Sequence, residues 1–351
     1  MRIAIDARLV AGTNTGDSSY WTCLVDAFGT YFPEIEFCLF SNTTKPKNVP
    51  LAPNCSWHTI TGGSSRWWSL ATFPLAARKL KCDITHAQYS ISPLAKNSVT
   101  TIHDISFLIN PEWFTPKDRK LLQATIPLSA KLAKRIITVS ETSRQEIVRF
   151  LPGTREKVRV AHNATPYWIQ RVDKETALLN IKKLGIESPF LLTVGTNWAR
   201  KNMQLAIDAT RDLGISLVVT GKQGEKLTGS HCRAVGYVDN ATLCSLYSAC
   251  SLYLAPSFHE GFGIPILEAF RCGAPVICGY GGAMPEVAGT AGIVKRDYDS
   301  KSWRETIQDM LSNPSKLEAM QQAGIRREAG FTWKASAERH IEVYREVMSE
   351  K

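Results

Sequence analysis

The stretch that decides the fold is SFHEGFGIPILEAFRCGAPVI, residues 257–277. A short apolar run, residues 252–256, precedes it and predicts a strand that leads into a glycine-rich turn. Pro265 predicts the start of a helix, because the N–H that proline lacks has no partner in a first helical turn. A helix N-terminus carries roughly half a positive charge and exposed N–H groups, so the segment is predicted to bind a diphosphate. The predicted contacts are Gly261, Phe262, Gly263, Ile264 and Pro265.

Two glutamates bracket this turn. Glu260 lies at the turn itself and Glu268 one helical turn inside the helix, so both carboxylates are predicted to face one ligand. One would bind sugar hydroxyls and the other a ribose diol. A solvated helix face would also explain two glutamates at this spacing, but the strand, the turn and the proline-started helix around them favour a binding site.

The rest of the chain alternates short β-branched runs with longer segments of helical period, the pattern of parallel strands joined by crossover helices. We therefore predict an α/β fold with two doubly wound, Rossmann-like sheets. The predicted strands are residues 2–6, 36–41, 83–87, 98–103, 135–140 and 158–161, then 190–195, 216–221, 234–238, 252–256, 275–279 and 291–294.

Such sheets bind ligands at the carboxyl ends of their strands, so two of them predict one deep cleft between domains. The irregular stretch 162–184 predicts the domain boundary. We assign residues 1–165 to an N-terminal domain, 166–335 to a C-terminal domain and 336–351 to the end of a terminal helix that begins near residue 333.

Composition limits the classes of protein that remain. The chain has 351 residues, a length that predicts two packed domains. Its net charge of +10 predicts an anionic partner. The nine cysteines form no CxxC pair and are predicted to act as small apolar core residues. The first residues, MRIAIDARLV, lack a signal-peptide pattern, and no run of eighteen apolar residues follows. We expect a cytoplasmic location.

The sequence resembles the retaining GT-B glycosyltransferases of the large E-x7-E family, glycosyltransferase family 4. The match consists of Glu260-GFGIPIL-Glu268, followed by GAP at 273–275 and PEV at 285–287. The resemblance implies a GT-B fold, with the terminal helix packing back on the N-terminal domain, and a nucleotide-sugar donor that needs no metal.

Further matches imply roles for other residues. In LLTVGTNWARKN, residues 191–202, Arg200 and Lys201 resemble the clamp on the donor diphosphate, and in TTIHDISF, residues 100–107, His103 resembles the histidine that contacts the donor sugar. The other candidate nucleotide contacts are Thr196, Asn197, Thr220, Gly221, Lys222, Tyr237 and Val238. In the N-terminal loop 11–21, Gly16 is the candidate close-approach glycine, but a serine stands where similar proteins carry an arginine.

No carboxylate nucleophile for a double displacement is evident in the first half. The resemblance implies a front-face transfer in which the leaving phosphate takes the acceptor proton. Arg200, Lys201 and the helix N-terminus would stabilise the leaving group, and Glu260 and His103 would orient the sugar. The HDISF segment at 103–107 and the VGT and RKN elements within residues 194–202 resemble the corresponding motifs of mannosyltransferases. GDP-mannose is therefore the first candidate donor, with UDP-sugars as the alternative, and a glycan or lipid-linked saccharide is the expected acceptor.

Residues 64–81 mix Trp67, Trp68 and Leu70 with basic residues, which suits peripheral contact with an anionic membrane. The alternative is that both tryptophans are core or acceptor-pocket residues.

Rival functions are a nicotinamide-dependent oxidoreductase, which should show GxGxxG, a basic nucleic-acid-binding module, and a sugar-nucleotide epimerase or phosphorylase of the same fold. The dispersed basic residues do not favour nucleic acid.

Overall fold

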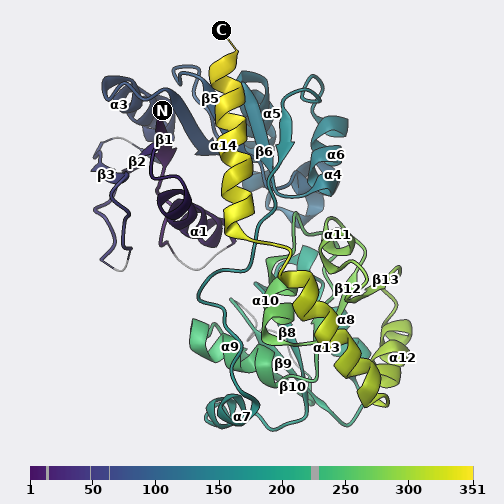
Figure 1. Cartoon of the computed structure of the whole chain (residues 1–351). Coiled ribbons are helices and arrows are strands. Elements are labelled where there is room, and N and C mark those ends of the chain that lie inside the picture. Colours follow the sequence, from purple (N-terminus) through teal and green to yellow (C-terminus); the bar gives the residue numbers. More distant parts are fainter. Residues whose placement is uncertain (13–15, 48, 63, 223–228, 351) are drawn as a thin grey trace. The chain divides into compact units, whose positions relative to one another are not determined.

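The computed structural model describes residues 1–12, 16–47, 49–62, 64–222 and 229–350, and it divides into two compact units (Figure 1). The first comprises Met1–Asn163 with Thr332–Lys351, and the second comprises Ala164–Phe331. The domain boundaries predicted after residues 165 and 335 lie close to these divisions.

The first unit is built on a seven-stranded sheet of order β3-β2-β1-β4-β5-β6-β7, in which all pairs are parallel. Its strand order reverses between β1 and β4, which makes this the topological switch point of the sheet. The strands are β1 (Arg2–Asp6), β2 (Glu36–Ser41), β3 (Cys55–Thr59), β4 (Ile84–Gln88), β5 (Ser98–Thr101), β6 (Arg135–Thr138) and β7 (Val158–Val160).

Helices cover both faces of this sheet. They are α1 (Gly16–Tyr31), α2 (Ser65–Trp67), the π-helical turn η1 (Trp68–Thr72), α3 (Phe73–Lys79), α4 (Ser106–Ile109), the 3-10 turn η2 (Pro111–Trp113), α5 (Pro116–Leu132), α6 (Glu141–Phe150) and α14 (Trp333–Ser349). The terminal helix α14 lies beside α1 and buries Ala337, Ile341, Tyr344 and Val347 in one core with β1 and β2 (Figure 1). The predicted return of the terminal helix to the N-terminal half is confirmed.

Hydrogen bonds fasten α14 in addition to this apolar contact. His340 Nδ1 lies 2.7 Å from the carbonyl oxygen of Ser336, which can only accept, so Nδ1 carries a proton. Burial lowers the pKa of His340 to about 4, and the neutral ring must therefore accept at Nε2. The donor is Tyr20 Oη at 2.7 Å, and Tyr20 Oη in turn accepts from Thr101 Oγ1 at 2.9 Å.

The same logic extends to β4. Because the single hydroxyl proton of Thr101 goes to Tyr20, Thr101 Oγ1 must accept from His86 Nε2, 2.8 Å away. Burial lowers the pKa of His86, so the neutral ring accepts at Nδ1 from Tyr344 Oη at 2.6 Å. The result is one directional chain of hydrogen bonds that joins α1, β4, β5 and α14, with each tautomer fixed.

The second unit holds a six-stranded parallel sheet of order β10-β9-β8-β11-β12-β13, whose switch point lies between β8 and β11. The strands are β8 (Phe190–Val194), β9 (Ser216–Thr220), β10 (Cys232–Gly236), β11 (Leu252–Ala255), β12 (Val276–Gly279) and β13 (Ile293–Lys295). The helices are α7 (Lys174–Lys182), η3 (Ala199–Lys201), α8 (Met203–Thr210), α9 (Asn240–Ala249), α10 (Ile264–Cys272), α11 (Met284–Ala288), α12 (Ser300–Leu311) and α13 (Pro314–Glu328).

The predicted fold class is confirmed, since both units are Rossmann-like α/β folds with parallel sheets. Twelve of the strands coincide with the predicted runs to within a few residues, while β3 was not predicted because its sequence, CSWHT, is short and mostly polar. The predicted strand at 234–238 is shifted, so Tyr237 and Val238 follow β10 instead of lying in it. All nine cysteines are free thiols, and eight of them are buried, as expected.

Candidate active site

The main cluster of predicted site residues lies at the switch point of the second sheet, where the carboxyl ends of β8 and β11 are neighbours. The segment after β8 forms η3, which carries Arg200 and Lys201, and the segment after β11 forms the turn that carries Glu260. A backbone hydrogen bond from Phe258 N to Arg200 O, 2.7 Å long, ties the two segments together. The structure therefore brings together three of the four predicted catalytic residues.

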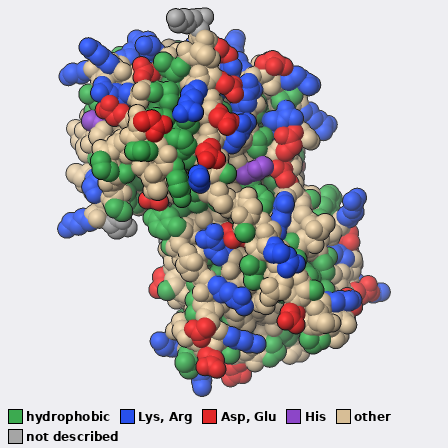
Figure 2. Space-filling view, in the orientation of Figure 1, with side chains coloured by type: hydrophobic (Ala, Val, Ile, Leu, Met, Phe, Trp, Pro, Cys, Tyr) green, Lys and Arg blue, Asp and Glu red, His purple; other side chains and the backbone are tan. Residues whose placement is uncertain are grey.

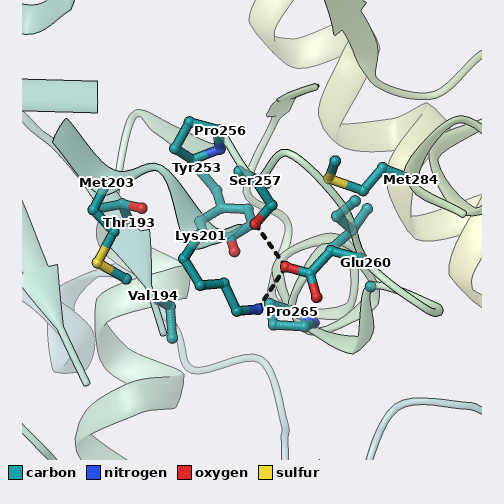
Figure 3. Close-up of a pocket in the computed structure, with 13 residues that line it drawn as sticks. Thr193, Val194, Lys201, Met203, Tyr253, Pro256, Ser257, Glu260, Pro265 and Met284 are labelled. Atoms are coloured by element: carbon teal, nitrogen blue, oxygen red, sulfur yellow. Dashed lines mark hydrogen bonds and ion pairs between the residues drawn. The ribbon is translucent and has the colours of Figure 1, made fainter. Parts of the chain in front are cut away.

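Glu260 is the centre of this cluster (Figure 3). Its Oε1 receives the ammonium of Lys201 at 2.5 Å and the hydroxyl of Ser257 at 2.6 Å, and its Oε2 receives Arg200 Nη1 at 3.2 Å. Only 13% of the Glu260 side chain is exposed. The carboxylate is thus held from several sides by the residues that were predicted to clamp a diphosphate.

The charge of Glu260 follows from these neighbours. Burial alone would raise its pKa, but the positive charges of Lys201 and Arg200 and the hydrogen bonds from Lys201 and Ser257 lower it to about 2. Two cations surround one carboxylate, so this group of three keeps one positive charge. Such a site suits an anion that can take over the contacts of the cations.

A second glycine-rich segment supports the turn from behind. A Cβ on Gly281 would lie 1.8 Å from Phe258 O, and one on Gly282 would lie 2.2 Å from Glu260 O, so both positions need glycine. Ala283 N donates to Glu260 O at 2.8 Å. Neither this support nor the role of Ser257 was predicted from the sequence, although the GYGGAM run before the PEV element could have indicated the support.

Helix α10 begins at Ile264, as predicted from Pro265 within one residue. Its N-cap is Gly263, at φ +106°, and no side chain caps this helix end. The geometry leaves the N-terminus of α10 beside the Glu260 turn without a competing carboxylate cap, as a phosphate-binding helix end requires.

Glu268 differs from Glu260 in its surroundings. Tyr247 Oη donates to Glu268 Oε2 at 3.1 Å. Burial raises the pKa of Glu268 to about 7, against the opposing effect of this hydrogen bond. The two glutamates are therefore in different states near neutral pH: Glu260 is ionised and Glu268 titrates.

A small cavity lies beside the Lys201–Glu260 pair (Figure 3). Its volume is about 10 Å³, and its walls include Thr193, Lys201, Met203, Ser257, Glu260 and Ile266. A space of this size holds about one water molecule. The cavity is too small for a sugar in this arrangement of the side chains.

The predicted nucleotide contacts gather at the carboxyl ends of β8, β9 and β10. A Cβ on Gly221, at φ +134°, would lie 2.0 Å from Gly195 O, so these two segments approach as closely as glycine allows. Asn197 N donates to Lys222 O at 3.0 Å, next to Thr196 and Thr220. The ammonium of Lys222 lies 5.9 Å from the ring centre of Tyr237, which is 53% exposed. Tyr237 therefore presents an exposed aromatic side chain, and Val238 is the next residue in the chain.

His103 and Gly16 belong to the first unit, whereas the Glu260 cluster belongs to the second. His103 is 8% exposed, and its ring lies edge-on to Tyr20 with 4.7 Å between ring centres. Burial lowers its pKa, despite the opposing charges of Asp17 and Asp104, so the ring is neutral at pH 7. Gly16 is the exposed first residue of α1, and residues 13–15 of the predicted loop lie outside the described residues.

Among the described residues, no group of three or more His, Cys, Asp or Glu side chains could hold a metal ion. In the same part of the chain, no helix combines the length and apolarity needed to cross a membrane.

Comparisons with known proteins agree with this geometry. The family model described as glycosyl transferases group 1 matches residues 177–327, and the model described as glycosyltransferase family 4 matches residues 36–166. The O-antigen chain mannosyltransferase B of Escherichia coli is 32% identical over 71% of this chain and 70% of its own length. The O-antigen chain mannosyltransferase RfbU of Salmonella typhimurium is 27% identical over 80% of this chain and 76% of its own.

Solved structures share the fold. A sucrose-phosphate synthase from Thermosynechococcus elongatus superposes with a TM-score of 0.78 at 18% identity and covers both chains completely. The matches to both halves, together with the paired glutamates and the basic residues that hold Glu260, show that this chain belongs to glycosyltransferase family 4 and is a glycosyltransferase.

Proposed function

We propose that the protein transfers mannose from GDP-mannose to a glycan or lipid-linked saccharide with retention of the anomeric configuration. The observation that carries the proposal is the cluster of Lys201, Arg200 and Glu260 at the switch point of the second sheet. The choice of mannose is supported by the names of two relatives, both O-antigen chain mannosyltransferases. UDP-sugars remain the alternative donors.

In the proposed reaction, the donor diphosphate lies at the N-terminus of α10 and takes over contacts of Lys201 and Arg200. The bond between the anomeric carbon and the phosphate oxygen breaks while the acceptor hydroxyl bonds to the same face of that carbon. The hydroxyl proton passes to the leaving phosphate oxygen. Lys201 and Arg200 stabilise the charge that this oxygen gains, and Glu260, released from contacts with the cations, orients the hydroxyls of the donor sugar.

His103 is proposed to contact the donor sugar as a neutral hydrogen-bonding group, since burial keeps its pKa below the usual range. Glu268 is proposed to accept hydrogen bonds from the ribose diol, and the segments after β9 and β10 to contact ribose and base. We propose that no metal takes part, because the cations of Lys201 and Arg200 supply the charge that a metal would offer the diphosphate.

We also propose that residues 64–81 touch an anionic membrane from the cytoplasmic side. Trp67 is 61% exposed and Leu70 is 44% exposed, next to Arg66, Arg78 and Lys79, which are also exposed. Trp68 is buried, so the alternative reading as a core residue applies to that tryptophan. Flotation with anionic vesicles tests the contact, and protein that stays in the soluble fraction would contradict it.

A nucleic-acid-binding role is less well supported. On the face drawn in Figure 2, lysine and arginine side chains are interspersed with acidic ones and do not form a continuous basic stripe. An epimerase of the same fold would interconvert the free sugar nucleotide without an acceptor, so product analysis separates it from a transferase.

The test of the proposed function is donor hydrolysis, screened over GDP-, UDP- and dTDP-sugars without acceptor. GDP-mannose should be cleaved fastest, with and without a chelator. Preferential cleavage of a UDP-sugar would overturn the choice of donor, and loss of activity in chelator would overturn the metal-independent mechanism.

A further inference from the structure

The first unit contains a second group of polar side chains that the proposed reaction does not use. Gln88 ends β4, one of the two strands that flank the switch point of the first sheet. Both its amide oxygen and its amide nitrogen are buried, and neither has a hydrogen-bond partner among the described residues. An amide buried in this way costs free energy unless something outside the chain satisfies it.

His103 offers a second unsatisfied atom nearby. Its Nε2 is buried without a hydrogen bond to any described residue, and the carboxylate of Asp17 is 3.7 Å away, which is too far for one. Gln88 pairs in register with Thr101, two residues before His103. Residues paired in register in a parallel sheet point to the same face, so Gln88 and Thr101 share one face of the sheet, and His103 follows two residues after the end of β5.

The backbone at this edge is strained. Tyr89, directly after Gln88, adopts φ +61°, which a residue with a bulky side chain rarely does. Tyr89 N donates to Thr101 O at 3.0 Å, and the Tyr89 ring lies 5.7 Å from the His103 ring, centre to centre. Strain of this kind is concentrated at ligand-binding sites.

The chemistry of the group indicates its ligand. An amide offers two donors and an acceptor, and a neutral imidazole offers one donor and one acceptor. Asp17 adds a negative charge beside His103, which disfavours a phosphate. A hydroxyl, which both donates and accepts, complements Gln88 and His103 without any charge.

We propose that Gln88 binds a hydroxyl group of a saccharide substrate, beside His103, at the switch point of the first sheet. The inference rests on the proposed function and adds a residue that determines sugar specificity. The saccharide is either the donor sugar or the acceptor, and the chemistry of recognition is the same for both.

The test is Gln88→Leu, which removes both polar atoms at similar volume. KM for the bound saccharide should rise roughly tenfold to hundredfold, because the hydroxyl loses its partner. If KM rises for donor hydrolysis without acceptor, Gln88 binds the donor sugar. If KM rises only for transfer to an acceptor, Gln88 binds the acceptor. Deoxy analogues should be discriminated by the wild type and not by the variant.

Thermal stability separates binding from a structural role. Since Gln88 has no partner in the free protein, Gln88→Leu should keep or raise Tm, whereas a structural glutamine would lower it. The matched control is Thr100→Val on β5, where another buried, unpartnered oxygen lies on the opposite face of the sheet. This control should also keep or raise Tm but leave KM unchanged.

Wild-type kinetics or a lowered Tm for Gln88→Leu would overturn the proposal. If the wild type transfers no sugar at all, the proposed function fails separately. Heat stability with methyl α-mannoside then still tests Gln88, because only the wild type should be stabilised by the glycoside. Equal responses of the two proteins would count against the inference.

Discussion

The two units each contain a polar cluster, and the two clusters are built in opposite ways. In the second unit, Lys201 and Arg200 hold an ionised Glu260 at the carboxyl ends of β8 and β11, and the three side chains together carry a net positive charge. In the first unit, Tyr20, Thr101 and His340 belong to a neutral chain of hydrogen bonds that lies in the core.

The difference has a functional meaning. The cations of the second unit are paired with a carboxylate that an incoming anion can replace, so this cluster can reorganise around a substrate. Each hydrogen bond in the neutral chain depends on the proton position of the next, so that cluster can only fix α14 in place. We therefore expect substitutions to separate the two roles, activity at the Glu260 cluster and stability at the neutral chain of hydrogen bonds.

The largest effect is expected for Lys201→Met. The variant loses the charge nearest Glu260 and, in the proposed reaction, a contact to the leaving phosphate, so kcat should fall about 10²- to 10³-fold. The control is Lys316→Met, which removes an exposed ion pair with Asp309. Surface pairs contribute little, so the control should be as active as the wild type. A Lys201→Met enzyme within a few-fold of wild-type kcat would show that the cluster is structural.

The next effect concerns acid stability in the first unit. The pKa of His340 is about 4 in the folded state and near 6.5 when unfolded, so the unfolded chain binds more protons between these values. The free energy of unfolding should therefore fall as the pH falls from about 6.5 to about 4. One such group accounts for a loss of about 2 kcal/mol at pH 5. Urea unfolding at pH 7 and pH 5 measures it.

His340→Gln should reduce this dependence, with a remainder due to His86, whose pKa burial also lowers, and the same change at the exposed His162 should leave it unchanged. Nitrogen NMR supplies an independent check, since the derived tautomers require a proton on Nδ1 of His340 and on Nε2 of His86. The opposite tautomer at either ring would break the directional chain.

The sequence was informative where local pattern determines structure. Pro265 and the glycines around it mark the start of α10, and β-branched runs mark most strands. The resemblance to the family indicated that Arg200 and Lys201 lie near Glu260, and the structure brings the three together because both segments follow the carboxyl ends of strands that flank the switch point. Whether they bind the donor stays a prediction.

The remaining features depend on long-range packing that no local pattern encodes. His340 reaches Tyr20 from the other end of the chain. The vacant hydrogen-bonding capacity of Gln88 is visible only when every neighbour is known. Such contacts are tertiary, so periodicity and composition carry no signal for them.

A smaller effect is expected from the titration of Glu268. Burial raises its pKa to about 7, and its ionised form would accept hydrogen bonds from the ribose diol. Nucleoside diphosphate affinity should therefore rise with pH up to about 7 and then level off, by up to about tenfold per pH unit below that value. Calorimetry at pH 6 and pH 8 measures this. Glu268→Gln should bind equally at both values, and a wild type without pH dependence would refute the role.

The smallest effect is expected for Ser257→Ala, which removes one of the hydrogen bonds to Glu260 and leaves the ion pair with Lys201. The loss should be about 1 kcal/mol, or roughly fivefold in kcat/KM. If Ser257 acts by holding the carboxylate, its removal should matter less once Glu260 is already replaced by glutamine, because the charge-assisted bond is gone. Equal losses in both backgrounds would mean that the serine acts independently of Glu260, and the charged cluster would then consist of the glutamate and its two cations alone.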